Sequence, residues 1–166
     1  MDIRRFTIAA VVCCASASFV PAQAQEMVFL IRHAEKEASG KDPKLTGAGR
    51  ERAGDWADML QFGGIDVVFT SDATRTRETG QIISESLDVP RKEVSREDVA
   101  GLMDLLEFDH ADEKVLIVGH AETIPLILSR LGVSDMIEIS QDDYANLLVV
   151  TPGPDDEPAL VRLRMP

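Results

Sequence analysis

The chain has 166 residues and a formal net charge of −12 at pH 7, with 29 acidic and 17 basic residues. That length is typical of one ordinary domain. An electric field of this sign repels polyanions, so the composition argues against nucleic acid and anionic membrane surfaces as partners. An anionic ligand would need a local cluster of positive groups in a chain that is otherwise acidic.

The first 24 residues have the composition of a signal peptide. A basic start precedes an apolar run over residues 6–20, and residues 22–24 supply an A-x-A cleavage pattern. The apolar run is shorter than the roughly 20 residues that a membrane-spanning helix needs. We therefore expect residues 1–24 to be removed on export, leaving residues 25–166 as one periplasmic or secreted domain. A buried N-terminal helix is the alternative.

Both cysteines of the chain, Cys13 and Cys14, lie in this N-terminal segment. The mature chain would then have no thiolate nucleophile, no disulfide and no cysteine-based zinc site. A lipid anchor on Cys13 or Cys14 is the alternative to cleavage after Ala24, although Val12 is larger than the small residue expected before a lipidated cysteine.

From residue 27 onward, apolar strand-like runs alternate with amphipathic helical patterns. In chain order the patterns predict a buried strand at 27–31, a helix at 46–62, a strand at 66–70, a helix at 74–87, an extended stretch after Pro90, a helix at 95–108, a buried strand at 114–119 and a helix at 124–131. Three further segments alternate as strands do, "IEIS" (137–140), "LLVVT" (147–151) and "ALVRLRM" (159–165). Residues 152–158 would join the last two as a hairpin or a longer connection.

Strands alternating with helices predict an α/β domain of three layers, α/β/α, with a mostly parallel central sheet. In such sheets, ligands bind at the carboxyl ends of the strands. Two of the three histidines, His33 and His120, each follow an apolar strand closely and begin the same triplet, His-Ala-Glu. The fold therefore predicts both imidazoles at one edge of the sheet.

Two arginines accompany these histidines. Arg32 ends a buried strand, where a guanidinium is costly unless it is paired, and a bound anion is a natural partner. Arg75 lies near the start of the helix expected at 74–87, whose first N–H groups are free to meet an anion. Arg32 and Arg75 would supply the local positive charge, and their planar guanidiniums suit the bidentate binding of a phosphate.

Other interpretations of the same residues have less support. Either histidine alone could be an ordinary packing residue with a hydrogen bond. A metal site of histidines and glutamates would place a cation beside two arginines, and the zinc deaminases with a His-x-Glu pattern also need a Pro-Cys-x-x-Cys segment, which the chain lacks. A serine hydrolase using Ser71 would need a G-x-S-x-G turn, which is absent. We expect no metal and no cofactor.

Four ordered motifs resemble those of the histidine phosphatase superfamily, which has the phosphoglycerate-mutase-like fold. They are "RHAE" (32–35), "LTGAGRERA" (45–53), "TSDATRTRET" (70–79) and "VGHAET" (118–123). The chain is most similar to small members without a cap domain, such as bacterial phosphohistidine phosphatases and short exported relatives. The resemblance implies that His33 is the nucleophile that becomes phosphorylated, and that Arg32, Arg75 and His120 complete a phosphate pocket.

The chemistry of these side chains agrees with that role. An imidazole with a pKa of about 6.5 is largely neutral at pH 7, so one ring nitrogen is free to attack phosphorus. Fixed positive groups would stabilise the charge that develops on the phosphoryl oxygens. We therefore expect a metal-independent phosphatase that acts on a small phosphomonoester or phosphoamide. A phosphoglycerate-type mutase and a non-catalytic phosphate-binding module are the alternatives.

The sequence leaves the proton donor for the leaving group open. In the mutase branch of the superfamily an acid follows the second arginine at some distance, which makes Glu97 and Asp98 candidates. In the acid-phosphatase branch an aspartate directly follows the second histidine, but that position is Ala121 here. Glu122 is a third candidate, because a location at the strand edge could raise its pKa and keep it protonated.

Overall fold

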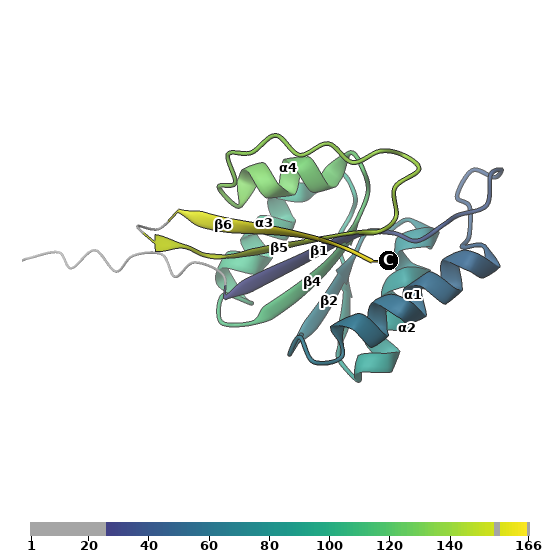
Figure 1. Cartoon of the computed structure of the whole chain (residues 1–166), viewed down its shortest axis with the longest axis horizontal. Coiled ribbons are helices and arrows are strands. Elements are labelled where there is room, and N and C mark those ends of the chain that lie inside the picture. Colours follow the sequence, from purple (N-terminus) through teal and green to yellow (C-terminus); the bar gives the residue numbers. More distant parts are fainter. Residues whose placement is uncertain (1–25, 155–156, 166) are drawn as a thin grey trace, which may run out of the picture.

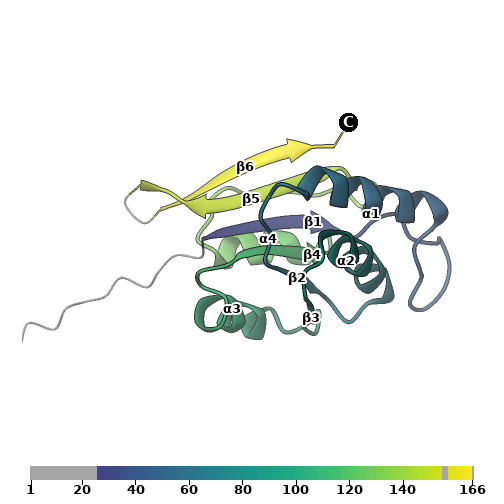
Figure 2. The same cartoon turned by 90° about the horizontal axis from the view of Figure 1, so that it is seen from below.

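A computed structural model describes residues 26–154 and 157–165 of the chain. Its centre is a six-stranded sheet in the order β3-β2-β4-β1-β5-β6. The strands are β1 (Met27–Arg32), β2 (Val67–Thr70), β3 (Arg91–Glu93), β4 (Lys114–Gly119), β5 (Asn146–Pro152) and β6 (Pro158–Arg164). Figure 2 shows this order as a stack that runs from β6 at the top to β3 at the bottom.

The sheet is mostly parallel, as the sequence predicts. β3, β2, β4 and β1 run in the same direction, whereas β5 pairs antiparallel with β1, and β6 antiparallel with β5. The central strands are buried on both faces, which is why they read as continuous apolar runs without alternation. The carboxyl ends of β1, β2 and β4 therefore meet at one edge, and β5 begins at the same edge.

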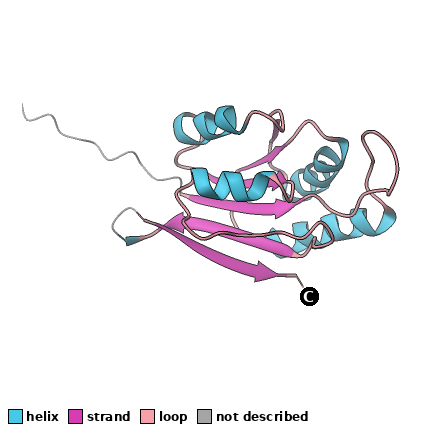
Figure 3. Cartoon of the chain, turned by 90° about the horizontal axis from the view of Figure 1, so that it is seen from above, coloured by secondary structure: helices cyan, strands magenta, loops and turns pink. Residues whose placement is uncertain are grey.

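Helices cover both faces of the sheet, which confirms the three-layer architecture (Figures 1 and 3). One face packs against α1 (Gly47–Leu60) and α2 (Thr74–Leu87), and the other against α3 (Val99–Phe108) and α4 (Thr123–Arg130). Successive residues of β1 point to opposite faces, so Leu30 joins the core under α3 and α4 while Ile31 joins the core under α1 and α2.

The strand predicted at residues 137–140 is wrong. In the part of the chain that the structure describes, this segment is irregular and lies in the connection from α4 to β5. Ile137 and Ile139 are half-buried and pack against the core, which explains their alternation, but no strand pairs with the segment. An alternating pattern reports which side chains face the core, and it does not report whether the backbone finds a ladder partner.

The structure changes one predicted boundary and decides between two predicted connections. α3 begins at Val99 rather than near residue 95, because the Asp98 side chain caps it by accepting a hydrogen bond from the Gly101 N–H. The hairpin is confirmed, since β5 and β6 pair as far as Pro152 and Pro158.

The predicted signal peptide, with the alternative lipid anchor, lies at residues 1–24, outside the described residues, so it stays a prediction. Within the described residues, none of the helices has the length and apolar character needed to cross a bilayer.

The "LTGAG" stretch fixes the start of α1 against the segment that follows His33. The Thr46 hydroxyl accepts a hydrogen bond from the Gly49 N–H at 3.0 Å, and the Thr46 N–H donates to the Glu35 carbonyl at 2.9 Å. Gly49 lies so close to this backbone that an added Cβ would sit 2.2 Å from the Glu35 carbonyl oxygen. A glycine is required here for close approach.

Gly49→Ala should therefore lower the free energy of unfolding by about 1–3 kcal/mol, as overpacking against a fixed backbone does. Gly54→Ala is a matched control on the same helix, because nothing lies within 4 Å of its added Cβ. The control should raise stability by about 0.5–1 kcal/mol, since alanine is the better helix former. Urea denaturation of both variants measures the difference, and a Gly49→Ala protein as stable as the control would contradict the proposed close contact.

Candidate active site

Three strand ends and one helix start bring the candidate residues together. His33 follows β1, Ser71 follows β2, His120 follows β4, and Arg75 lies in the first turn of α2. The ring centroids of His33 and His120 are 5.3 Å apart, with the rings inclined at 64°. The two imidazoles, which are 87 positions apart in the sequence, therefore lie side by side at the predicted edge of the sheet.

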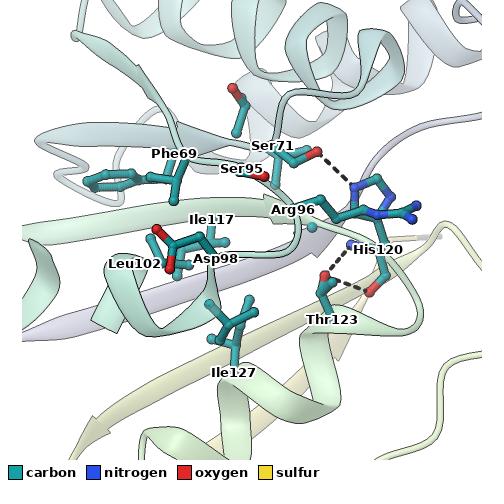
Figure 4. A pocket seen from close by; sticks show the side chains of 15 residues that line it. Phe69, Ser71, Ser95, Arg96, Asp98, Leu102, Ile117, His120, Thr123 and Ile127 are labelled. Atoms are coloured by element: carbon teal, nitrogen blue, oxygen red, sulfur yellow. Dashed lines mark hydrogen bonds between the residues drawn. The ribbon is translucent and has the colours of Figure 1, made fainter. Parts of the chain in front are cut away.

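Arg75 bridges the two rings. Its Nε donates to His33 Nε2 at 3.2 Å, and its Nη2 lies 3.2 Å from His120 Nδ1. The other nitrogen of each ring also has a partner. His33 Nδ1 lies 2.8 Å from the Ala34 carbonyl, and His120 Nε2 lies 2.8 Å from the Ser71 hydroxyl (Figure 4).

These contacts assign the ring protons. A carbonyl only accepts, so His33 carries its proton on Nδ1 and leaves the lone pair of Nε2 open toward Arg75. Because a guanidinium only donates, His120 Nδ1 is the acceptor in the second contact, and His120 Nε2–H donates to Ser71. Both rings are therefore neutral in this arrangement.

Burial and positive neighbours keep the rings neutral. Burial lowers the pKa of His33 to about 3, against an opposing effect of the Ala34 carbonyl, and the charge of Arg32 adds to the decrease. Burial, followed by the charge of Arg75, lowers the pKa of His120 to about 4. At neutral pH each ring thus keeps an unprotonated nitrogen, and an unprotonated nitrogen is what a nucleophile requires.

Arg32 is buried beside His33, but protein groups rather than an open anion site satisfy much of its guanidinium. Its Nη1 donates to the carbonyls of Ser140 and Gln141 in the connection before β5, at 3.1 Å in the case of Ser140. The guanidinium also stacks on the Tyr144 ring, with its central carbon 4.2 Å from the ring centroid. The Nε of Arg32 has no hydrogen-bond partner among the described residues.

A carboxylate occupies the start of α2, where the sequence suggested free N–H groups for an external anion. The Asp42 carboxylate accepts from the Thr74 N–H at 3.0 Å, and one of its oxygens lies 3.7 Å from Arg75 Nη1. Hydrogen bonds from the Thr74 hydroxyl and N–H lower the pKa of Asp42. This contact ties the loop at residues 36–44 to Arg75.

The three candidate acids take different positions. Asp98 is used as the cap of α3, and Glu97 is exposed at the mouth of the site beside Arg75. Partial burial raises the pKa of Glu122, but hydrogen bonds from its own backbone N–H and from Gln141 outweigh that effect, so the net pKa is lowered. The expected increase for Glu122 is therefore wrong, and this carboxylate is ionised at neutral pH.

Arg96 is a residue of this edge that the sequence analysis did not mark. It follows β3 and lines the same hollow as His120, toward which its side chain extends in Figure 4. Its place follows from the topology, because β3 is parallel to β2 and its carboxyl end therefore faces the edge that holds Ser71 and His120. The strand is only three residues long, and its direction was not readable from its pattern.

Comparison with known proteins finds a similar family. Residues 28–97 match the sequence model of the histidine phosphatase superfamily, branch 1. Over these residues the chain is similar to the histidine phosphatase superfamily. The matched region begins in β1 and ends between β3 and α3, and it includes the first three motifs. A search of curated proteins gives no significant match.

Solved structures of superfamily phosphatases share the fold of this chain. The protein histidine phosphatase SixA, complexed with tungstate, has a TM-score of 0.70 at 16% identity and covers 83% of this chain and 96% of its own. A protein from Agrobacterium tumefaciens assigned as the phosphohistidine phosphatase SixA has a TM-score of 0.65 at 20% identity, with coverages of 84% and 97%. The mycobacterial glucosyl-3-phosphoglycerate phosphatase, complexed with VO3, has a TM-score of 0.66 at 12% identity, with coverages of 85% and 100%.

The low pKa of His33 predicts a pH dependence of stability. Its folded pKa of about 3 lies below the unfolded value of about 6.5, so the unfolded state takes up a proton first as the pH falls. Protonation of His33 in the unfolded state therefore lowers the free energy of unfolding as the pH falls from about 6.5 toward the folded pKa. Between pH 6 and 5 the unfolding free energy of His33→Gln should fall less steeply than that of wild type, by about 1 kcal/mol per pH unit.

Denaturant titrations at a series of pH values test this prediction. The range above pH 7.5 is the control. There, His33 of wild type is neutral in both the folded and the unfolded state, so the unfolding free energies of wild type and His33→Gln should change with pH at the same slope. Parallel curves between pH 6 and 5 would show that His33 is protonated in the folded protein like an exposed histidine.

Proposed function

We propose that the protein is a metal-independent phosphatase that hydrolyses a small phosphomonoester or phosphoamide through a phosphohistidine on His33. The observation that carries this proposal is the unprotonated His33 Nε2, held 3.2 Å from the Arg75 guanidinium. The match of residues 28–97 to the superfamily supports it, and so do neighbours of the same fold that hold tungstate or VO3, two oxyanions that resemble phosphate.

In the first step, the lone pair of His33 Nε2 attacks phosphorus while the bond from phosphorus to the leaving group breaks. Arg75 would turn its N–H groups from the rings to the phosphoryl oxygens, where it stabilises the charge that develops. The bound phosphoryl group raises the proton affinity of His120, which can then donate from Nδ1 as well. The Ala34 carbonyl accepts from His33 Nδ1–H and stabilises the positive charge on the phosphorylated ring.

In the second step, water attacks the phosphohistidine, the N–P bond breaks, and inorganic phosphate leaves. The ring returns to its neutral form with the proton on Nδ1, because the Ala34 carbonyl continues to hold that proton. Ser71 keeps its contact with His120 Nε2 and so holds the second ring in place through both steps.

The state of the carboxylates favours substrates with good leaving groups. Glu122 is ionised at neutral pH, Asp98 caps a helix and Glu97 is exposed at the mouth of the site, so the free protein holds none of the three candidates in place as a proton donor. A phenolate leaves without a strong acid, and the nitrogen of a phosphoamide can carry its own proton. We therefore favour aryl phosphates and phosphoamides over simple alkyl phosphates as substrates.

Hydrolysis of p-nitrophenyl phosphate, combined with acid-free trapping of the phosphoenzyme, tests the proposed function. Wild type should release p-nitrophenol and form a phosphoenzyme that is labile to acid and stable to base. His33→Gln, which keeps the side-chain size and a hydrogen-bonding group, should lose at least 10³-fold in kcat/KM and form no phosphoenzyme.

Turnover by His33→Gln at the wild-type rate would refute the assignment of the nucleophile. Phosphate binding without turnover of any ester would favour the non-catalytic binding module. Transfer of the phosphoryl group to a second hydroxyl of the substrate, instead of to water, would favour a mutase.

We also propose export of the protein to the periplasm or beyond, as the pattern of residues 1–24 indicates. N-terminal sequencing of protein recovered from the periplasmic fraction should begin at Gln25. Full-length protein in the cytoplasm would contradict export, and a blocked, lipid-modified start at Cys13 or Cys14 would favour the lipid anchor.

A further inference from the structure

Hydrogen bonds hold the backbone around Arg96 at the edge of the sheet. Two residues before it, the Val94 N–H donates to the Thr70 carbonyl at 3.0 Å and extends the pairing with β2. The Arg96 N–H itself donates to the Asp72 carboxylate at 3.1 Å. The position from which the side chain of Arg96 extends is therefore determined by β2 and by the turn that follows it.

The side chain of Arg96 stands between two hollows. A hollow beside His120 lies between the sheet and α3, and both apolar and polar side chains line it (Figure 4). A wider and more polar hollow opens above Arg75. Its other lining residues are Lys41, Asp42, Asp72, Ala73, Ser95 and Glu97. Arg96 lines both hollows, so a ligand that extends outward from the histidines would pass it.

Arg96 differs from Arg75 in its partners. Arg75 is paired with Asp42, whereas within the described ranges no carboxylate oxygen lies within 4 Å of the Arg96 guanidinium. After burial, the charge of Arg96 is the largest influence that lowers the pKa of Arg75, and it also lowers the pKa of His120. Two guanidiniums thus repel each other across the free site, and a bound anion would offset that repulsion.

The phosphoryl group already has its partners at the inner end of the site, in Arg75 and the two histidines. Arg96 and His120 line one hollow, and His33 is not among the residues that line it, so Arg96 lies on the His120 side of the site. An anion that Arg96 binds would therefore belong to another part of the substrate. Asp72 and Glu97 border the same hollow and would repel a dianion more than a monoanion.

We propose that Arg96 determines specificity by binding a carboxylate of the substrate, so that the site prefers a phosphomonoester or phosphoamide whose leaving group carries a carboxylate. A guanidinium matches the two oxygens of a carboxylate with a pair of parallel hydrogen bonds. This inference deepens the proposed function, because it concerns the leaving-group side of the same site.

Two phosphonates that are not hydrolysed test the inference by calorimetry on the full chain. They are 3-carboxybenzylphosphonate and 3-carbamoylbenzylphosphonate, which differ only in the charge of the group opposite Arg96. Wild type should bind the carboxylate more tightly. Arg96→Gln should weaken the carboxylate ligand at least tenfold and the carboxamide ligand less than twofold, and Arg96→Lys should lie between Arg96→Gln and wild type.

Arg130→Gln is the matched control. Arg130 is an exposed arginine in the last turn of α4, and α4 begins at the site edge and runs back toward the opposite edge. The control removes the same charge and should leave both dissociation constants unchanged.

Equal weakening of the two ligands by Arg96→Gln would show that Arg96 serves the phosphoryl group, and it would overturn the inference. Unchanged binding of the carboxylate ligand, or failure of wild type to bind either ligand, would overturn it too. The result is independent of turnover. Selectivity for the carboxylate without a phosphoenzyme would refute the proposed hydrolysis and leave the role of Arg96 in place.

Discussion

The site depends on one cation, the Arg75 guanidinium, held between two neutral imidazoles. A guanidinium can only donate hydrogen bonds, so its contacts with His33 and His120 exist only while both facing nitrogens are unprotonated. Burial supplies that condition by lowering the pKa of each ring. The same arrangement therefore holds an unprotonated ring nitrogen beside a positive charge, the two features that the proposed phosphoryl transfer uses, and Asp42 balances the charge in the free protein.

The connection between α4 and β5 holds the side chains around the two histidines in place. The Gln141 side chain joins Arg32 to Glu122, with contacts of 3.2 Å and 2.9 Å. Two residues further on, Asp143 is paired with Arg164 of β6, whose hydrogen bond lowers the pKa of Asp143 to about 2. The C-terminal hairpin thus helps to position the connection whose carbonyls bind Arg32. The added antiparallel strands contribute to the site although they carry none of the four central side chains.

In the two His-Ala-Glu triplets the alanines have the same environment, whereas the glutamates have different partners. Ala34 and Ala121 are both buried where each chain segment leaves the sheet. The glutamates act differently. Glu35 pairs with Arg52 of α1 at 2.6 Å, whereas Glu122 accepts a hydrogen bond from the connection before β5. The repeat reflects a common strand-to-loop geometry rather than two equivalent catalytic units.

The sequence by itself determined the layers and the placement of His33 and His120. Continuous apolar runs mark strands buried on both faces, and the parallel arrangement brings their carboxyl ends to one edge. Only the tertiary structure decided which groups bind Arg32. It also decided that Asp42 binds the first N–H of α2 and that Arg96 lies beside His120. These contacts join residues from different loops, 108 positions apart for Arg32 and Ser140, and leave no local period in the sequence. Hydrogen bonds and pKa values follow distances in space, and residue spacing along the chain does not determine those distances.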